Sequence, residues 1–241
     1  FIEMFEYVIV LVSNINVFSV YITITSTIQI MIYYFLVFML TAYWCSKRVR
    51  IKLIYVLLLF VLLTINSSLI QPIQSVNMID LYGDSILIVD SFDQCNILID
   101  TGDSDDYDSV ENFIRYKNVK RLDYLILTHN HDDHMGESQD IISLIDVRHI
   151  IDSTNGTEYD ELICGKLKLQ FFEFSNTYNE VNNSSLVFTL QISDRLYLFT
   201  GDMEKEKEEE FIELYDVDVD YLKSGHHGSI TSSSELFLDD I

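Results

Sequence analysis

No charged side chain occurs between Tyr7 and Ser46. This run is too long for one helix across a hydrocarbon core, which needs about 20 residues, and Ser13–Asn16 is a polar break within it. We therefore expect an interfacial or re-entrant piece over residues 4–20 and a first membrane-spanning helix over residues 23–45. A second uncharged, mostly apolar run predicts another span over residues 53–73. The alternative is a pair of helices buried in a soluble core.

The loop between these two apolar runs is basic, with Lys47, Arg48, Arg50 and Lys52. Positive charge beside the ends of membrane spans stays on the cytoplasmic side. The second span would then run outward. The sequence therefore predicts a multi-pass protein of the cell membrane, with everything after residue 73 on the outer face.

Charge divides the chain into the same two parts. Residues 1–72 carry four basic and two acidic side chains, whereas the remainder carries 11 basic and 36 acidic ones, a net charge of −25. A single Pro and 49% apolar residues exclude a disordered or collagen-like chain. We expect a membrane region over residues 1–72 and a separate domain over residues 73–241. Because the sequence starts at Phe1 and stops at Ile241, it is expected to be a fragment.

After Pro72 the pattern changes to short β-rich runs that alternate with helical ones. Strands are predicted over residues 76–81, 85–89, 96–99, 124–128, 167–174, 185–192, 195–199 and 217–222, and helices over residues 109–116, 137–145 and 203–215. Such a succession indicates an α/β layered sandwich. The three cysteines form neither a metal-type pair nor a disulfide framework. Cys95 and Cys164 could bridge in the fold, but the sequence leaves their pairing open.

Three histidines and two aspartates lie within Thr128–His134, directly after the apolar run Tyr124–Leu127. Neutral imidazole nitrogens and carboxylate oxygens are the usual ligands of zinc and similar divalent ions. On a loop, this spacing can direct two histidines toward one ion and an Asp-His pair toward a second. A polar turn that happens to be rich in histidine is the alternative. Because the whole chain has only six histidines, their clustering favours a metal site.

Further chemistry-bearing residues follow other predicted strands. Asp202, with Gly201 beside it, suits an oxygen that bridges two ions, although Gly-Asp is also an ordinary turn. His226 and His227 are flanked by glycines, so one could be a ligand while the other donates a proton or a hydrogen bond; a surface histidine pair is the alternative. Asp100 could orient a ligand histidine or only form a turn.

The remaining polar candidates have simpler interpretations. His149 stands beside Ile150 and Ile151 and is expected to be a structural or surface residue. Asn182 and Asn183 are expected to form a turn rather than to bind an ion.

Taken in order, five segments of this sequence resemble the metallo-β-lactamase superfamily, and more narrowly the C-terminal domain of ComEC-type competence proteins. These segments are Leu98–Gly102, Thr128–His134, Asn183–Val187, Thr200–Asp202 and Gly225–Ser229. The resemblance covers nearly all of residues 76–241. It implies an αββα sandwich, truncated at its C-terminus because strands expected after the second histidine pair are absent, and preceded by transmembrane α-helices. Residues 1–72 are consistent with the end of that family's channel region.

The resemblance also implies roles for particular residues. The metal ligands would be His129 and His131 for a first ion, Asp133 and His134 for a second, Asp202 as the bridge, and His226 or His227 as the last histidine. Catalytic roles would fall to Asp133, Asp202, His226 and His227. Asp84 and Asp100 would contact and orient the ligand side chains without binding an ion themselves. Where the superfamily often has another histidine, this chain has Asn182 and Asn183, so the first ion would be held more loosely.

The implied activity is metal-dependent phosphodiester hydrolysis with two divalent ions, zinc or manganese. Its substrate would be the DNA strand that is not transported, while the other strand passes through a membrane channel with other competence proteins. A net charge of −25 argues against strong binding of a polyanion. Two alternatives therefore stay open. One is a hydrolase of a small phosphoester or lactone, and the other is a non-catalytic, metal-stabilised module of a membrane transporter.

Overall fold

The computed structural model describes Tyr34 and residues 74–90, 93–156, 159–175, 178 and 180–241. The chain divides into two units between Gln71 and Pro72, and the account below concerns the second. The segments predicted to lie in or across a membrane fall outside the described residues, apart from Tyr34. No helix within the described part of the chain is long and apolar enough to cross a membrane. The membrane spans therefore stay predictions.

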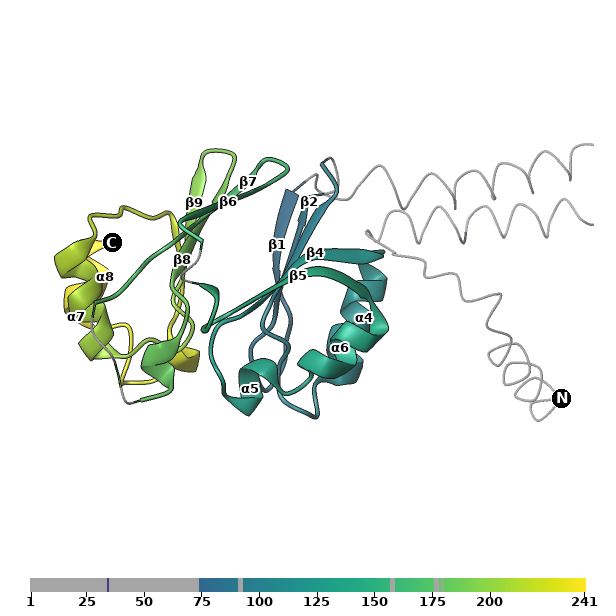
Figure 1. The fold of residues 1–241 in the computed structure, drawn as a ribbon, viewed down its shortest axis with the longest axis horizontal. Helices are drawn as coiled ribbons and strands as arrows, with labels where there is room; N and C mark the ends of the chain where they lie inside the picture. The colour runs from purple at the N-terminus through teal and green to yellow at the C-terminus, as the bar shows by residue number, and fades with distance from the viewer. Residues whose placement is uncertain (1–33, 35–73, 91–92, 157–158, 176–177, 179) are drawn as a thin grey trace, which may run out of the picture. The chain divides into compact units, whose positions relative to one another are not determined.

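Two five-stranded sheets face each other in the described domain (Figure 1). The first contains, in spatial order, β1 (Gln74–Met78), β2 (Ile86–Asp90), β3 (Cys95–Ile99), β4 (Arg121–Leu127) and β5 (Asp146–Asp152). The second contains β10 (Tyr221–Lys223), β9 (Arg195–Phe199), β8 (Phe188–Ile192), β7 (Leu167–Phe171) and β6 (Glu161–Cys164). This confirms the predicted α/β sandwich.

Helices cover the outer side of each sheet, which gives an αββα order of layers (Figure 1). The first sheet carries α4 (Tyr107–Tyr116) and α6 (Ser138–Leu144), and the second carries α7 (Lys205–Leu214) and α8 (Glu235–Asp240). Three shorter turns of helix lie in the loops: α5 (Asp132–Met135), η3 (Asn182–Ser184) and η4 (His226–Gly228).

Strand direction explains where polar residues gather. β3 and β4 run parallel in the first sheet, and β9 and β10 run parallel in the second, whereas the hairpins β1–β2 and β8–β9 are antiparallel. The carboxyl ends of parallel neighbours lie at the same edge of a sheet. Asp100 therefore follows β3 beside Thr128, which follows β4, and Thr200 follows β9 beside Ser224, which follows β10.

The core forms because apolar residues alternate along the strands with a period of two. In β2, Ile86 and Ile88 belong to the cluster between the sheets, whereas Leu87 and Val89 pack toward the helices of the first sheet. Phe188 lies in the same central cluster and is fully buried. Each such side chain contributes about 1.5–3 kcal/mol through its burial.

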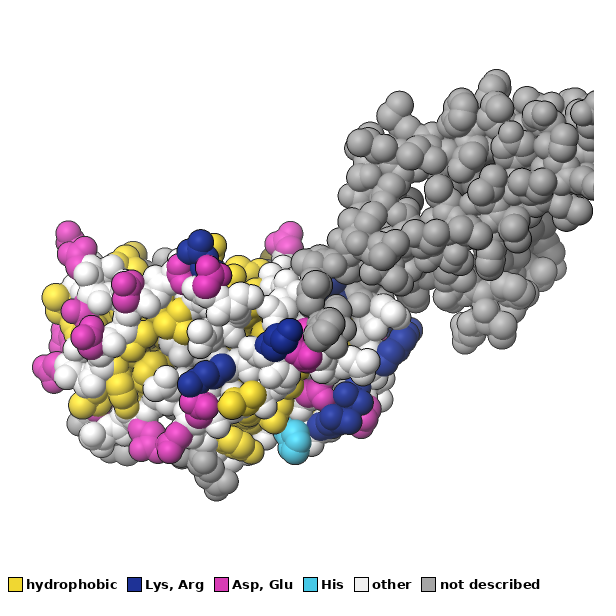
Figure 2. Space-filling view, turned by 90° about the horizontal axis from the view of Figure 1, so that it is seen from above, with side chains coloured by type: hydrophobic (Ala, Val, Ile, Leu, Met, Phe, Trp, Pro, Cys, Tyr) yellow, Lys and Arg dark blue, Asp and Glu magenta, His cyan; other side chains and the backbone are white. Residues whose placement is uncertain are grey.

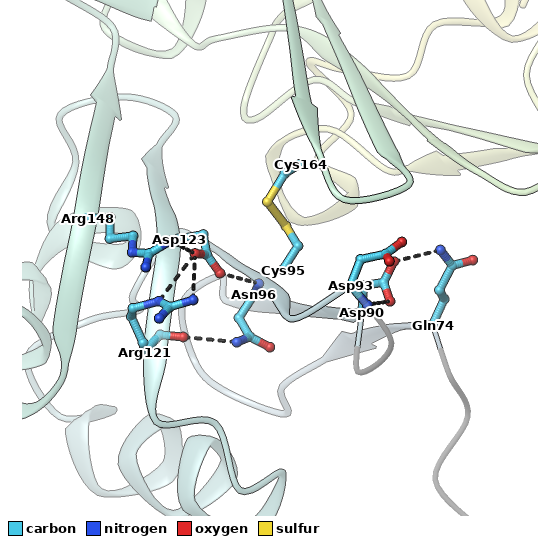
Figure 3. Close-up of a disulfide and its surroundings, with 9 residues drawn as sticks. All are labelled: Gln74, Asp90, Asp93, Cys95, Asn96, Arg121, Asp123, Arg148 and Cys164. Atoms are coloured by element: carbon cyan, nitrogen blue, oxygen red, sulfur yellow. Dashed lines mark hydrogen bonds and ion pairs between the residues drawn. A yellow bond between two sulfur atoms is a disulfide. The ribbon is translucent and has the colours of Figure 1, made fainter.

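Two strands escaped the sequence prediction, and a disulfide joins one of them to the other sheet. β5 and β6 are edge strands with many exposed residues, so neither shows a strong apolar pattern. Cys95, the first residue of β3, is bonded to Cys164, the last residue of β6, with their Cα atoms 5.8 Å apart (Figure 3). The pairing that the sequence left open therefore exists, and it links the two sheets covalently.

Candidate metal centre

The loop after β4 holds His134 in a fixed orientation. His134 is fully buried, and its Nδ1 donates a hydrogen bond to Asp100 Oδ2 at 2.9 Å. The same carboxylate accepts hydrogen bonds from Thr128, at 2.7 Å from the backbone N and 2.9 Å from Oγ1. Asp100 thus ties the ends of β3 and β4 together and directs His134 Nε2 away from the protein core. This is the orienting position that the sequence suggested for Asp100.

The other two histidines of this loop face a common space. His129 Nε2 lies 3.1 Å from His131 Nδ1 and 3.9 Å from Asp202 Oδ2. His129 is buried and Thr128 Oγ1 lies 3.1 Å from its Nδ1, whereas His131 is partly exposed just before α5. His129 Nε2 therefore lies near both a ring nitrogen of His131 and a carboxylate oxygen of Asp202.

Asp202 reaches this space from the opposite sheet through a tight turn after β9. Gly201 has φ of +53°, and a Cβ there would approach Ser185 Oγ to 2.7 Å, so glycine is required. The backbone N of Asp202 donates to Ser185 Oγ at 3.0 Å. Lys207 of α7 fixes the Ser185 segment from behind, because its Nζ donates to the carbonyls of Asn183 at 3.0 Å and Ser185 at 2.7 Å. Burial lowers the pKa of Lys207 to about 8.

His226 and His227 take different positions, although both have positive φ values of 47° and 52°. His227 Nε2 lies 3.1 Å from Asp133 Oδ2 and 3.7 Å from Asp202 Oδ2. His226 Nε2 lies 4.0 Å from Asp202 Oδ2, and its Nδ1 lies 3.1 Å from Thr231 Oγ1. Left-handed backbone at two successive non-glycine residues is unfavourable and is typical of functional sites.

Asp84 lies closer to this group than the sequence suggested. Its backbone N donates to the Asp133 carbonyl at 2.9 Å, and a Cβ on Gly83 would meet that carbonyl oxygen at 2.1 Å, so the turn fits only with glycine. Asp84 Oδ2 lies 4.0 Å from His134 Nε2, and Asp84 Oδ1 lies 3.8 Å from His227 Nδ1. Asp84 is thus placed where it can itself bind a metal ion, rather than only contact a residue that does.

The electrostatics of the cluster follow from burial and neighbouring charge. Burial lowers the pKa of His129 to about 3, and the charge of His134 adds to this effect. Burial also lowers the pKa of His134, but the carboxylates of Asp100 and Asp202 outweigh it and raise the value to about 10. Burial would raise the pKa of Asp202, yet His134, Lys223 and His129 hold it below its ordinary value. In the absence of metal, the two carboxylates therefore favour the protonated form of His134, and a metal ion at Nε2 would displace that proton.

The residues present fit divalent metal ions. Among the described residues, two buried atoms of the cluster, His134 Nε2 and Asp202 Oδ1, have no hydrogen-bond partner; His134 Nε2 lies 3.2 Å from Asp202 Oδ2 without the alignment of a hydrogen bond. Ligand atoms of Asp84, His134, Asp202 and His227 all lie within 4.8 Å of one another. A four-coordinate zinc site needs ligand atoms roughly 3.4 Å apart, which is close to these separations.

The seven residues predicted as ligands lie in one cluster, with Asp202 near its centre. They are His129, His131, Asp133, His134, Asp202, His226 and His227. The sequence reading gave no role in the centre to Lys223, Lys207 or Ser185. Two signals in the sequence could have indicated such roles. Lys223 stands two residues before Gly225-His226, and Ser185 lies within the segment Asn183–Val187. Among the other predictions, His149 stacks on Tyr124 at the surface, and Asn182 and Asn183 form the turn η3.

Comparison with known proteins agrees with this arrangement. Residues 78–163 match the metallo-beta-lactamase superfamily. The described region has a metallo-beta-lactamase-like α/β sandwich fold. The chain is also 29% identical over 208 residues to ComE operon protein 3 of Bacillus subtilis (strain 168), which covers 69% of this chain and 27% of that protein. The chain thus spans about a quarter of that relative's length.

Solved structures similar to this chain include two different kinds of protein. BJP-1, a subclass B3 metallo-beta-lactamase of Bradyrhizobium japonicum, is 16% identical with a TM-score of 0.40, covering 54% of this chain and 60% of that chain. CmlA, a diiron beta-hydroxylase from Streptomyces venezuelae, is also 16% identical with a TM-score of 0.40, covering 63% of this chain and 34% of that chain.

Proposed function

We propose that this domain is a metal-dependent phosphodiesterase that cleaves DNA at the outer face of a membrane, in a system of competence. The convergence of three histidines from the first sheet with Asp202 and His227 from the second supports it most directly. His134 Nε2 is buried and has no hydrogen-bond partner among the described residues, so this nitrogen is available to bind a metal ion. The similarity to ComE operon protein 3 supports the link to competence.

Two groups of residues would hold the metal ions, zinc or manganese. His129 and His131 form one group and Asp84, His134 and His227 the other, with Asp202 between them and Asp133 beside His227. When bound, such ions lower the pKa of water and neutralise phosphate oxygens. The chain itself keeps the ligands in place through Asp100 and Ser185.

His226 is the residue best placed to protonate the departing alkoxide. Its Nδ1 lies 3.1 Å from Thr231 Oγ1 and 3.4 Å from Glu204 Oε1, which orients the ring. Its Nε2 then faces Asp202 at 4.0 Å and remains open toward solvent, because the side chain is 29% exposed. A histidine held in this way can donate a proton to a leaving group.

The outer-face location is part of this proposal, and the disulfide supports it. Disulfides persist in oxidising surroundings and are rare in the cytosol. The bond between Cys95 and Cys164 therefore agrees with the orientation expected from the basic loop over residues 47–52. A periplasmic- or surface-type reporter fused after Ser75 should be active, and an active cytoplasmic reporter at that position would contradict this topology.

A small phosphoester is the second candidate substrate, because the domain's charge is unfavourable for long DNA. The face shown in Figure 2 carries Lys and Arg side chains scattered among Asp and Glu, without a continuous basic stripe. With a net charge of −25 outside residues 1–72, the domain lacks the phosphate contacts that normally supply affinity for DNA.

Cleavage of end-labelled linear DNA by the whole chain, loaded with Zn²⁺ or Mn²⁺, tests the main proposal. Activity should require metal and should be lost in His131→Ala and Asp202→Ala. His149→Ala is the matched control, since His149 stacks on Tyr124 away from the cluster and its loss should not matter. Cleavage of a small diester but not of DNA would support the second candidate. Folded, metal-loaded protein that cleaves neither would contradict both.

A further inference from the structure

Lys223 brings the positive charge of a side chain to the edge of the metal centre. It is the last residue of β10, and its side chain is 9% exposed. Its Nζ donates to Asp84 Oδ2 in an ion pair. Because Asp84 lies 4.0 Å from His134 and 3.8 Å from His227, the ammonium is anchored beside the residues that would hold a metal ion.

Several other cationic side chains of the described domain form ion pairs or hydrogen bonds away from the metal centre. Arg121 and Arg148 share Asp123, as Figure 3 shows, at the end of the first sheet where the disulfide lies. Arg195 pairs with Asp220 and Lys168 with Glu161. Lys207 donates to backbone carbonyls. Lys223 differs from these because its partner belongs to the candidate metal centre.

We propose that Lys223 binds an anionic oxygen of the substrate beside the metal centre, and so selects a phosphodiester over a neutral ester. This inference rests on the proposed hydrolase function and specifies its substrate class. A lysine ammonium has three N–H donors, and its contact with Asp84 uses one of them. The others can reach a substrate oxygen while Asp84 keeps the ammonium in place.

The charge of the domain gives such a residue a large effect. An anionic substrate that approaches 36 acidic and 11 basic side chains is repelled at a distance, so a fixed cation at the point of reaction must offset that repulsion locally. A neutral ester or lactone meets no such repulsion when it binds, so its KM should depend little on the ammonium. The same variant should therefore affect the two classes of substrate unequally.

The test compares Lys223→Gln, Lys223→Arg and the control Lys168→Gln in the whole, metal-loaded chain. Lys168 pairs with Glu161 on the surface, so its variant removes the same charge away from the centre. With bis(p-nitrophenyl) phosphate, Lys223→Gln should raise KM about 10- to 100-fold, as expected for a charge-assisted hydrogen bond. Lys223→Arg should restore most of this loss, and Lys168→Gln should behave as wild type. The KM for neutral p-nitrophenyl acetate should change far less than that for the diester in both Lys223 variants.

Metal content and phosphate binding separate this inference from its alternatives. Each variant should retain the wild-type metal content, and calorimetry should show weaker binding of inorganic phosphate by Lys223→Gln alone. A loss of metal in Lys223→Gln, or an equal loss on both substrates, would mean that Lys223 only supports the centre, and would overturn the inference. Unchanged KM and phosphate binding would overturn it as well. If wild type hydrolyses no phosphodiester, the proposed function fails, but phosphate binding that depends on Lys223 would still support the site.

Discussion

The two sheets contribute to the metal centre in different ways. The first sheet supplies its histidines from one loop, within six residues of His129, and both His129 and His134 are buried and held by Asp100 and Thr128. The second sheet supplies Asp202 from one strand end and the histidine pair from another. His226 and His227 are 29% and 33% exposed and have left-handed backbone. One half is thus rigid and local, and the other depends on tertiary packing.

This difference shows where the centre's geometry is vulnerable. Ser185 holds the Asp202 turn directly. Lys207 holds Ser185 through a hydrogen bond that exists only when α7 packs on the second sheet. The match to the metallo-beta-lactamase superfamily ends at residue 163, so it includes the histidine loop and not Asp202, His226 or His227. The first half should therefore tolerate changes in the second sheet, whereas the second half should not tolerate changes where α7 packs on that sheet.

Asp202→Asn should have the largest effect, because this carboxylate lies between the two groups of histidines. Both His129 and His134 face it, at 3.9 Å and 3.2 Å. Loss of one preorganised charge at a reacting centre costs about 10²–10³-fold in rate, and the loss of a ligand adds to this. We expect phosphodiester turnover to fall by about 10³-fold and bound metal to decrease. Asp105→Asn is the control, and equal losses in both variants would show that general charge, not the site, matters.

Removal of the disulfide should have the next largest effect, and on stability rather than chemistry. The bond joins residues 69 positions apart in the sequence and links the two sheets, and a loop of that length corresponds to about 4 kcal/mol of unfolding free energy. Urea unfolding of Cys95→Ser/Cys164→Ser should show this loss. A double variant as stable as wild type would mean that packing alone holds the halves together.

The sequence predicted the layers and the clustering of histidines because both have strong local signals. Strands β8 and β9 lie within the ranges predicted for them, and the histidine loop follows β4 directly. The edge strands β5 and β6 were missed because exposed strands lack a continuous apolar pattern. In α7, the apolar Leu214 is 49% exposed, whereas Lys207 and Glu208 are buried.

Long-range contacts were beyond the reach of the sequence. The ion pair of Lys223 with Asp84 joins residues 139 positions apart, and no periodicity connects such positions. The choice between His226 and His227 was likewise open, because it depends on how η4 approaches Asp133. Burial of Lys207 contradicts the usual preference of lysine for the surface and exists only because backbone carbonyls of Asn183 and Ser185 receive its donors.

Asp100→Asn should weaken metal binding more than Thr231→Val does, if the rigid half determines affinity. Asp100 orients His134, and changes behind a ligand histidine typically cost about 10- to 100-fold in metal affinity. Thr231 orients the exposed His226, whose ring can also contact Glu204, so we expect a change of only a few-fold. Calorimetric titration with Zn²⁺ measures both. A larger effect of Thr231→Val would reverse the comparison between the halves.

A pH dependence of stability is expected in the metal-free protein. The pKa of His134 is raised from 6.5 to about 10 in the folded state by Asp100 and Asp202. A group whose folded pKa is raised stabilises fully below its unfolded pKa, and this stabilisation is lost as pH rises through the folded pKa. In EDTA, the Tm of wild type should therefore exceed that of His134→Gln most near pH 6, and the difference should narrow between about pH 6.5 and 10. His149→Gln serves as the control, because His149 contacts the ring of Tyr124 rather than a carboxylate of the centre. A difference that stays constant over this range would mean that His134 contributes by packing, and the two halves would then be held together by shape rather than by charge.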